Sequence, residues 1–174
     1  MKKTIRNGIF ETNSSSVHVI AISKEKPKVL PSSIIFGHGE FGWEFDSYSD
    51  SYSKADYFNE AIHAVYSNYK DVEQGKERIK AVQDRVIADL AEKGIEAVFE
   101  PDQYYNQWGY ESGYIDHGRE LKNWVNDLLG DTDKLINYLF SSDSYVETGN
   151  DNYDGCPNVK DVDQDKYYTY EKWN

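Results

Sequence analysis

The chain has 174 residues, of which 39% are hydrophobic and 15% aromatic, and its formal net charge is −12 at pH 7. This length predicts a single domain that spans 1–174. The lone Cys156 excludes an intramolecular disulfide and a multi-cysteine zinc site. No segment approaches the ~20 apolar residues of a membrane span, and no apolar run follows the N-terminal lysines, so we expect a cytoplasmic protein with no membrane contact.

Strand patterns dominate the N-terminal part of the chain. In 17–22, Val17, Val19 and Ala21 alternate with His18, Ile20 and Ile22, which is typical of a β-strand. A polar turn precedes this segment, and a loop with two prolines follows it. We expect strands at 4–10, 17–22, 33–36 and 41–45, the last of them rich in aromatic residues.

Helical patterns fill the middle of the chain. Ser53 is the predicted start of the first helix, while Asp71 and Asp131 are the predicted N-caps of two later ones. The apolar spacing predicts helices at 54–69, 72–93, 119–129 and 132–141. Five residues of the last two should be buried, namely Leu121, Trp124, Leu128, Leu135 and Leu139.

Further strand patterns occur at 95–100, 145–148 and 167–173, and an aromatic loop is expected at 103–114. Strands therefore gather at both ends of the chain, with the helices between them. This order predicts an α+β fold, in which N- and C-terminal strands form a mixed or antiparallel sheet beside about four helices.

The negative charge is concentrated in two segments. Segment 40–60 holds six acidic residues against one lysine, and 140–174 holds eight against three lysines. A protein that binds nucleic acid directly usually carries a basic stripe, which this distribution lacks. We therefore expect a basic protein partner and no direct binding of nucleic acid.

The string at 10–18 offers a carboxylate, an amide, three serine hydroxyls and an imidazole within nine residues. A serine activated by His18 would be a nucleophile if a third group oriented the ring. Alternatively, the string is a turn in which Asn13 and the serines bond to backbone amides. Asp116-His117 likewise has two interpretations. Asp116 could orient the imidazole or share a metal with it, or one of the two residues could cap the start of a helix.

The acidic tail contains Asp161-x-Asp163-x-Asp165, which matches the first three ligand positions of an EF-hand loop. The match then fails, because Lys166 and Lys172 occupy the positions that need Gly and Glu. A solvated acidic loop is the better interpretation, with weak binding of a divalent ion as the alternative.

Four strings together resemble an uncharacterised family of phage, prophage and bacterial proteins. They are RxGxFETNSSSxH at 6–18, FGW at 41–43, GYIDH at 113–117 and TGNDN at 148–152. The resemblance spans nearly the whole chain and implies a setting in mobile genetic elements, hence the cytoplasm of a bacterial host, but no activity. It also suggests that polar residues from distant strings converge on one site.

Two functional hypotheses follow. The first is an acidic, anti-CRISPR-like inhibitor that binds a basic, nucleic-acid-handling enzyme such as a CRISPR nuclease and mimics its nucleic acid. Its expected contact residues are Glu40, Glu44, Asp46, Asp50, Asp161, Asp163 and Asp165.

The second hypothesis is a small enzyme, or a protein that binds a ligand or a metal, built on a polar cluster. The cluster comprises Glu11, Asn13, Ser16 and Asp116, and the candidate ligands of a divalent metal such as zinc are His18, His117 and Asp151.

Overall fold

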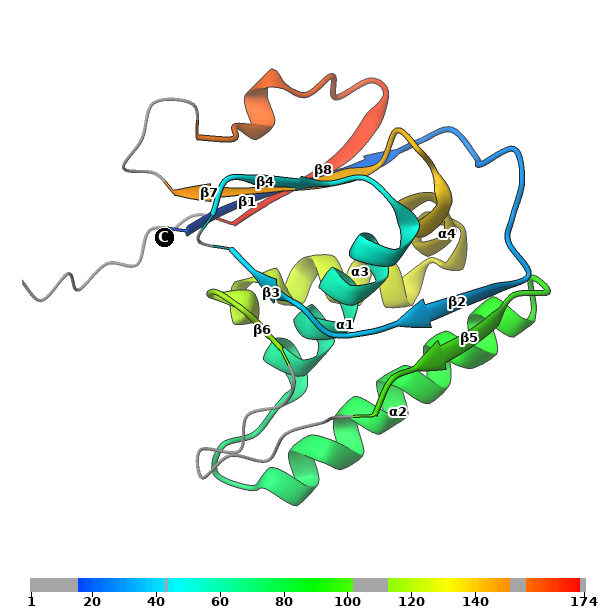
Figure 1. The fold of residues 1–174 in the computed structure, drawn as a ribbon, viewed down its shortest axis with the longest axis vertical. Helices are drawn as coiled ribbons and strands as arrows, with labels where there is room; N and C mark the ends of the chain where they lie inside the picture. Colours follow the sequence, from blue (N-terminus) through cyan, green and yellow to red (C-terminus); the bar gives the residue numbers. More distant parts are fainter. Residues whose placement is uncertain (1–15, 43, 102–112, 151–155, 173–174) are drawn as a thin grey trace, which may run out of the picture.

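The computed structural model describes residues 16–42, 44–101, 113–150 and 156–172. The fold is α+β, as predicted, with helices on one side of an antiparallel sheet (Figure 1). The predicted strand at 4–10 lies outside the described residues.

The main sheet has four strands in the order β4-β7-β1-β8. Strand β1 (Ser16–Ser23) lies at its centre and is antiparallel to β7 (Tyr145–Asn150) and β8 (Tyr167–Lys172). Strand β4 (Asp46–Tyr48) pairs with β7 and was not predicted. The two ends of the chain thus meet in one sheet, which confirms the arrangement that we expected.

Two short parallel pairs lie apart from this sheet. Strand β2 (Ser33–Phe36) pairs with β5 (Glu96–Phe99), and β3 (Glu40–Phe41) pairs with β6 (Tyr114–Ile115). The predicted strand at 41–45 is confirmed at 41, the last residue of β3, and is wrong at 42, 44 and 45. Gly42 has φ of +128°, outside the extended region, so the chain turns there and resumes as β4.

The four long helices are α1 (Ser51–Tyr66), α2 (Val72–Ala91), α3 (Lys122–Gly130) and α4 (Thr132–Phe140). Asp71 and Asp131 cap α2 and α4, as predicted. The predicted start at Ser53 is wrong, because the side chain of Asp50 accepts from the backbone of Tyr52 and Ser53 and starts α1 earlier. Two 3-10 turns, η1 (Gly118–Leu121) and η2 (Val159–Asp161), complete the fold.

The core lies between the helices and one face of the sheet. Ile20 and Ile22 of β1 pack there with aromatic side chains from α1, α3 and α4, and all five residues predicted to be buried are buried. On the opposite face Val17 and Val19 are also fully buried, where the segment that contains η2 contacts β1 (Figure 1). No helix among the described residues is long and apolar enough to cross a membrane.

Candidate functional site

The N-terminal half of β1 carries polar side chains into the interior. Ser16 and His18 are both fully buried, on the face that carries Ile20 further along the strand. The register places His18 opposite Thr148 and Lys172, which are also buried. Lys172 Nζ donates to the carbonyl and the hydroxyl of Ser16.

His18 is oriented by a buried phenol. Its Nδ1 lies 2.8 Å from the hydroxyl of Tyr57 on α1. The pKa of His18 is lowered from 6.5 to about 4, mainly by burial and then by the nearby Lys172 ammonium, while the carboxylate and backbone of Asp116 oppose the shift. The imidazole is therefore neutral at pH 7.

The tautomer of His18 follows from the count of hydrogen-bond donors. Burial raises the pKa of Tyr57 well above 10, so the phenol keeps its proton. Among the described residues, His18 Nδ1 is the acceptor that this proton reaches. Nδ1 therefore accepts, and in the neutral ring the second nitrogen, Nε2, carries the hydrogen.

His18 Nε2 has no hydrogen-bond partner among the described residues, although it is buried, and the same holds for Asp116 Oδ2. The two groups meet at Gly42. A Cβ added to this glycine would lie 3.1 Å from His18 Nε2 and 2.7 Å from the Asp116 Cβ. Gly42 therefore lets the His18 ring and the Asp116 side chain pack against the same backbone position, and each carries a buried polar atom that is unsatisfied.

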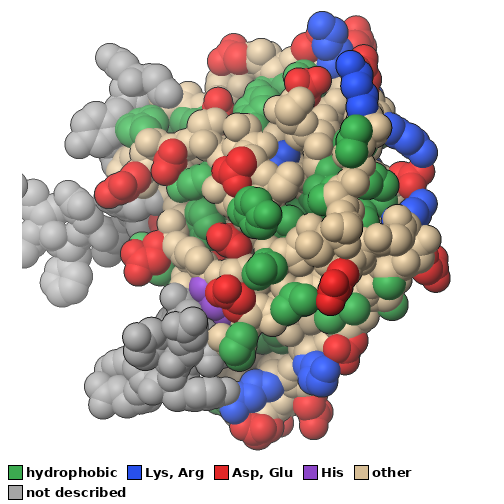
Figure 2. Space-filling view, turned by 45° about the vertical axis from the view of Figure 1, so that its right-hand side comes forward, with side chains coloured by type: hydrophobic (Ala, Val, Ile, Leu, Met, Phe, Trp, Pro, Cys, Tyr) green, Lys and Arg blue, Asp and Glu red, His purple; other side chains and the backbone are tan. Residues whose placement is uncertain are grey.

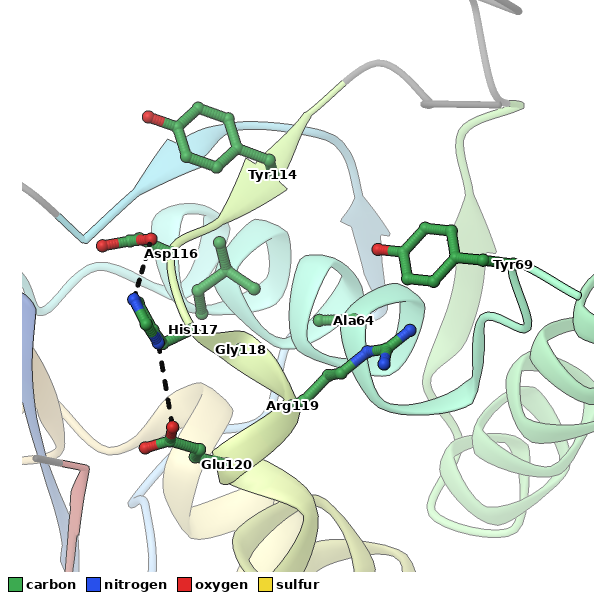
Figure 3. A pocket seen from close by; sticks show the side chains of 9 residues that line it. Ala64, Tyr69, Tyr114, Asp116, His117, Gly118, Arg119 and Glu120 are labelled. Atoms are coloured by element: carbon green, nitrogen blue, oxygen red, sulfur yellow. Dashed lines mark ion pairs between the residues drawn. The ribbon is translucent and has the colours of Figure 1, made fainter. Parts of the chain in front are cut away.

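Asp116 is the first of a row of ionisable side chains, Asp116, His117 and Glu120, that begins on the turn between β6 and η1. Its Oδ1 lies 3.7 Å from His117 Nε2, and His117 Nδ1 lies 3.7 Å from Glu120 Oε1 (Figure 3). His117 adopts the left-handed conformation, with φ of 52°. The next residue is Gly118, where a side chain would not fit, because an added Cβ would lie 2.1 Å from the Ile115 side chain.

A pocket of about 390 Å³ adjoins this row. Its walls include Tyr69, Tyr114 and Arg119, and the Arg119 guanidinium lies 4.5 Å from the centre of the Tyr69 ring. In Figure 3, Arg119 points toward Tyr69, whereas His117 lies between Asp116 and Glu120. The turn therefore carries the Arg119 cation beside the Tyr69 ring on one side and the row with the Asp116 and Glu120 carboxylates on the other.

The structure brings together several residues that the sequence analysis had named as candidate site residues. His18 lies beside Asp116, and Asp116 lies beside His117. Ser16 is two residues from His18 on the same face and holds Lys172. Glu11, Asn13 and Asp151 lie outside the described residues.

The predicted metal ligands fit a metal poorly. Within the described residues, no group of three or more His, Cys, Asp or Glu side chains could hold an ion. A metal at His18 Nε2 would also need the lone pair of that nitrogen, which carries hydrogen while Tyr57 donates to Nδ1. Nδ1 of His18 thus meets a hydroxyl and not a carboxylate or a carbonyl, which are the usual partners of the second nitrogen in a metal-bound histidine.

Sequence reasoning missed a second polar arrangement, around the turn at 37–39. Asp56 accepts from the backbone N–H of Gly37, and Asn59 donates to the Gly37 carbonyl. Glu60 Oε1 lies 2.8 Å from His38 Nδ1. The polar residues of α1 recur at helical spacing within its buried face, and this signal in the sequence could have revealed them.

The acidic residues assigned to a partner are all exposed but differ in their local roles. Asp50 caps α1, and Asp163 accepts from the backbone of Asp165. Glu44 precedes β4 and Asp46 begins it, so the two residues do not lie on one strand. In Figure 2 acidic side chains are interspersed with apolar ones, and most lysines and arginines lie toward the edges of the view.

Comparison of the chain with protein-family models, curated proteins and solved structures found no match.

Proposed function

We propose that this protein binds a small ligand through a hydroxyl group that fits between His18 Nε2 and Asp116 Oδ2. The observation that supports this proposal is the buried pair itself: a donor and an acceptor, both without partners, on the two sides of Gly42. A buried polar group without a hydrogen bond costs about 1–3 kcal/mol, so a fold that keeps two of them on side chains packed against Gly42 gains when a ligand satisfies both.

The chemistry of the pair favours a hydroxyl over other groups. A hydroxyl can accept from the His18 N–H and donate to the Asp116 carboxylate at the same time. A ligand carboxylate would repel Asp116, and an ammonium has no lone pair to accept from Nε2. A neutral polyol, a sugar or the sugar of a nucleoside therefore suits the site best.

The neighbouring pocket supports the same class of ligand. Tyr114 is 47% exposed and Tyr69 is 57% exposed, and both line the pocket beside Asp116. Aromatic faces of this kind pack well against the apolar face of a sugar ring or against a base. In the bound state Asp116 would accept the hydroxyl proton, which is the geometry of a general base.

Thermal-shift and calorimetric titrations with glycerol, ribose, glucose and uridine test the proposal. We expect at least one of them to stabilise the wild type, and the shift to disappear in Asp116→Asn and His18→Gln. Asp143→Asn, an exposed substitution away from the site, is the matched control and should respond like the wild type. Equal shifts in the site variants, or no shift in the wild type, would contradict the assignment.

The acidic inhibitor is the second candidate. Glu40, Glu44 and Asp46 are exposed on the segment that includes β3 and the start of β4, and none of them forms an ion pair with a described residue. These carboxylates are free to meet arginine and lysine in the groove of a basic partner such as a CRISPR nuclease.

Charge reversal tests this candidate without disturbing the fold. Glu44→Lys with Asp46→Lys should abolish inhibition of DNA cleavage by the nuclease, and Asp50 is left intact because it caps α1. The control carries the same change of charge elsewhere, as Glu77→Lys with Asp143→Lys. If both double variants inhibit equally, these carboxylates do not form the contact.

A further inference from the structure

A groove runs between helix α2 and strand β5, away from the His18 site. Its volume is about 440 Å³, and its lining includes Ile87 and Ala91 from α2, Ile95 just before β5 and Ala97 of β5. Within the described residues β5 pairs with β2 alone. One edge of β5 therefore keeps backbone N–H and C=O groups that no neighbouring strand takes up.

The surroundings of the groove combine apolar and acidic character. Ile87 is 36% exposed, and Val98 of β5 is 47% exposed. Glu92 and Glu96 are exposed at the α2–β5 connection, and neither forms an ion pair with a described residue. An unpaired strand edge beside apolar side chains is a template for another strand, and the two carboxylates select a basic one.

We propose that this groove receives the N-terminal segment, residues 2–10, of a second copy of the chain as an added β-strand. This segment has the required chemistry. It contains Lys2, Lys3 and Arg6 and no acidic residue, and its apolar Ile5 and Ile9 are four positions apart, on one face of an extended strand. In a chain of net charge −12, this segment is basic.

Reciprocal exchange of this segment makes a closed, two-fold symmetric dimer, because each copy offers one strand and one groove. Backbone hydrogen bonds along β5 would provide affinity. Lys3 or Arg6 opposite Glu92 or Glu96 would fix direction and register.

Sedimentation and light scattering of the full chain give the first test. We expect a dimer that dissociates on dilution and at high salt, since the flanking ion pairs are exposed. Ile87→Lys, which places a charge in the groove, should give a monomer with an unchanged circular dichroism spectrum. Val72→Lys introduces the same charge on the exposed surface of α2, outside the groove lining, and should leave the dimer intact. A monomeric wild type overturns the proposal.

A charge exchange identifies the occupant. Glu92→Lys with Glu96→Lys makes the groove basic, and Lys3→Glu with Arg6→Glu makes the N-terminal segment acidic. Each double variant alone should be monomeric, because its strand and its groove then carry like charges. An equimolar mixture should recover a one-to-one dimer, because each strand then meets a groove of opposite charge. A dimer that both double variants retain, or a mixture that stays monomeric, shows that residues 2–10 are not the occupant.

Discussion

The two halves of β1 are equally buried but differ in how the buried groups are satisfied. Ile20 and Ile22 lie in the apolar core, against aromatic residues of the helices. Ser16 and His18, on the same face, lie among Lys172, Thr148 and Asp116, where a donor and an acceptor have no partner. Burial of the apolar half is explained by stability, whereas we propose that burial of the polar half serves the binding of a ligand.

This difference shows how a site can be recognised when its residues are not exposed. An apolar side chain gains free energy from burial at any place in the core. A polar side chain gains it only when its hydrogen bonds are complete. The two halves of β1 therefore differ in the completeness of their hydrogen bonds and not in burial. Substitutions in each half can test this difference.

The largest effect is expected in the apolar half. Ile20→Ala removes fully buried methyl groups and should lower the free energy of unfolding by about 2–5 kcal/mol. Ligand-induced stabilisation should persist in this variant, because Ile20 does not touch the ligand pair. Urea unfolding with and without glycerol or ribose measures both quantities, and loss of the ligand response would break the separation of the halves.

A pH-dependent effect is expected in the polar half. The pKa of His18 is about 4 in the folded protein and near 6.5 in the unfolded chain. Between pH 6.5 and pH 4 the unfolded state binds a proton at His18, whereas the folded state does not. The contribution of His18 to the free energy of unfolding is therefore fully present above pH 6.5 and decreases as the pH falls toward 4. The loss attributable to His18 is about 3 kcal/mol.

Unfolding of the wild type and of His18→Gln between pH 7 and pH 4 measures this contribution. The variant should lose less stability over the window, since glutamine does not titrate. Parallel pH curves for the two proteins would contradict the buried, neutral state of His18.

The smallest effect on stability is expected at Gly42, against which the His18 ring and the Asp116 side chain pack. Gly42→Ala places a Cβ 2.7 Å from the Asp116 Cβ, at a φ that favours glycine, and should cost about 1–3 kcal/mol. It should also abolish ligand binding. Gly94→Ala, where the added Cβ meets nothing within 4 Å at φ of +80°, controls for backbone strain and should keep binding.

Much of the fold could be predicted because local signals determine it. The apolar run of β1 reflects a strand buried on both faces, the apolar spacing of α2 reflects one buried face, and the Asp71 and Asp131 caps lie where their helices begin. The turn at Gly42 could not be predicted, since its reason is the approach of His18 and Asp116 from elsewhere in the chain.

The candidate site was predicted only in part for the same reason. The strings with His18 and Asp116 were expected to meet, but Tyr57 appeared in the sequence as one more apolar position of a helix. The tautomer of His18, and with it the preference for a hydroxyl over a metal, depends on that tertiary contact. Periodicity and spacing along the chain do not contain it.

The most direct test of the account is the ¹⁵N NMR spectrum of the His18 ring, recorded from pH 7 to pH 3.5 and with the ligand found by titration. We expect a neutral ring with hydrogen on Nε2 and none on Nδ1, a pKa of about 4, and a change in the Nε2 resonance when the ligand binds. Hydrogen on Nδ1, or a pKa near 6.5, would contradict the claim that His18 offers a buried donor to a hydroxyl beside Asp116.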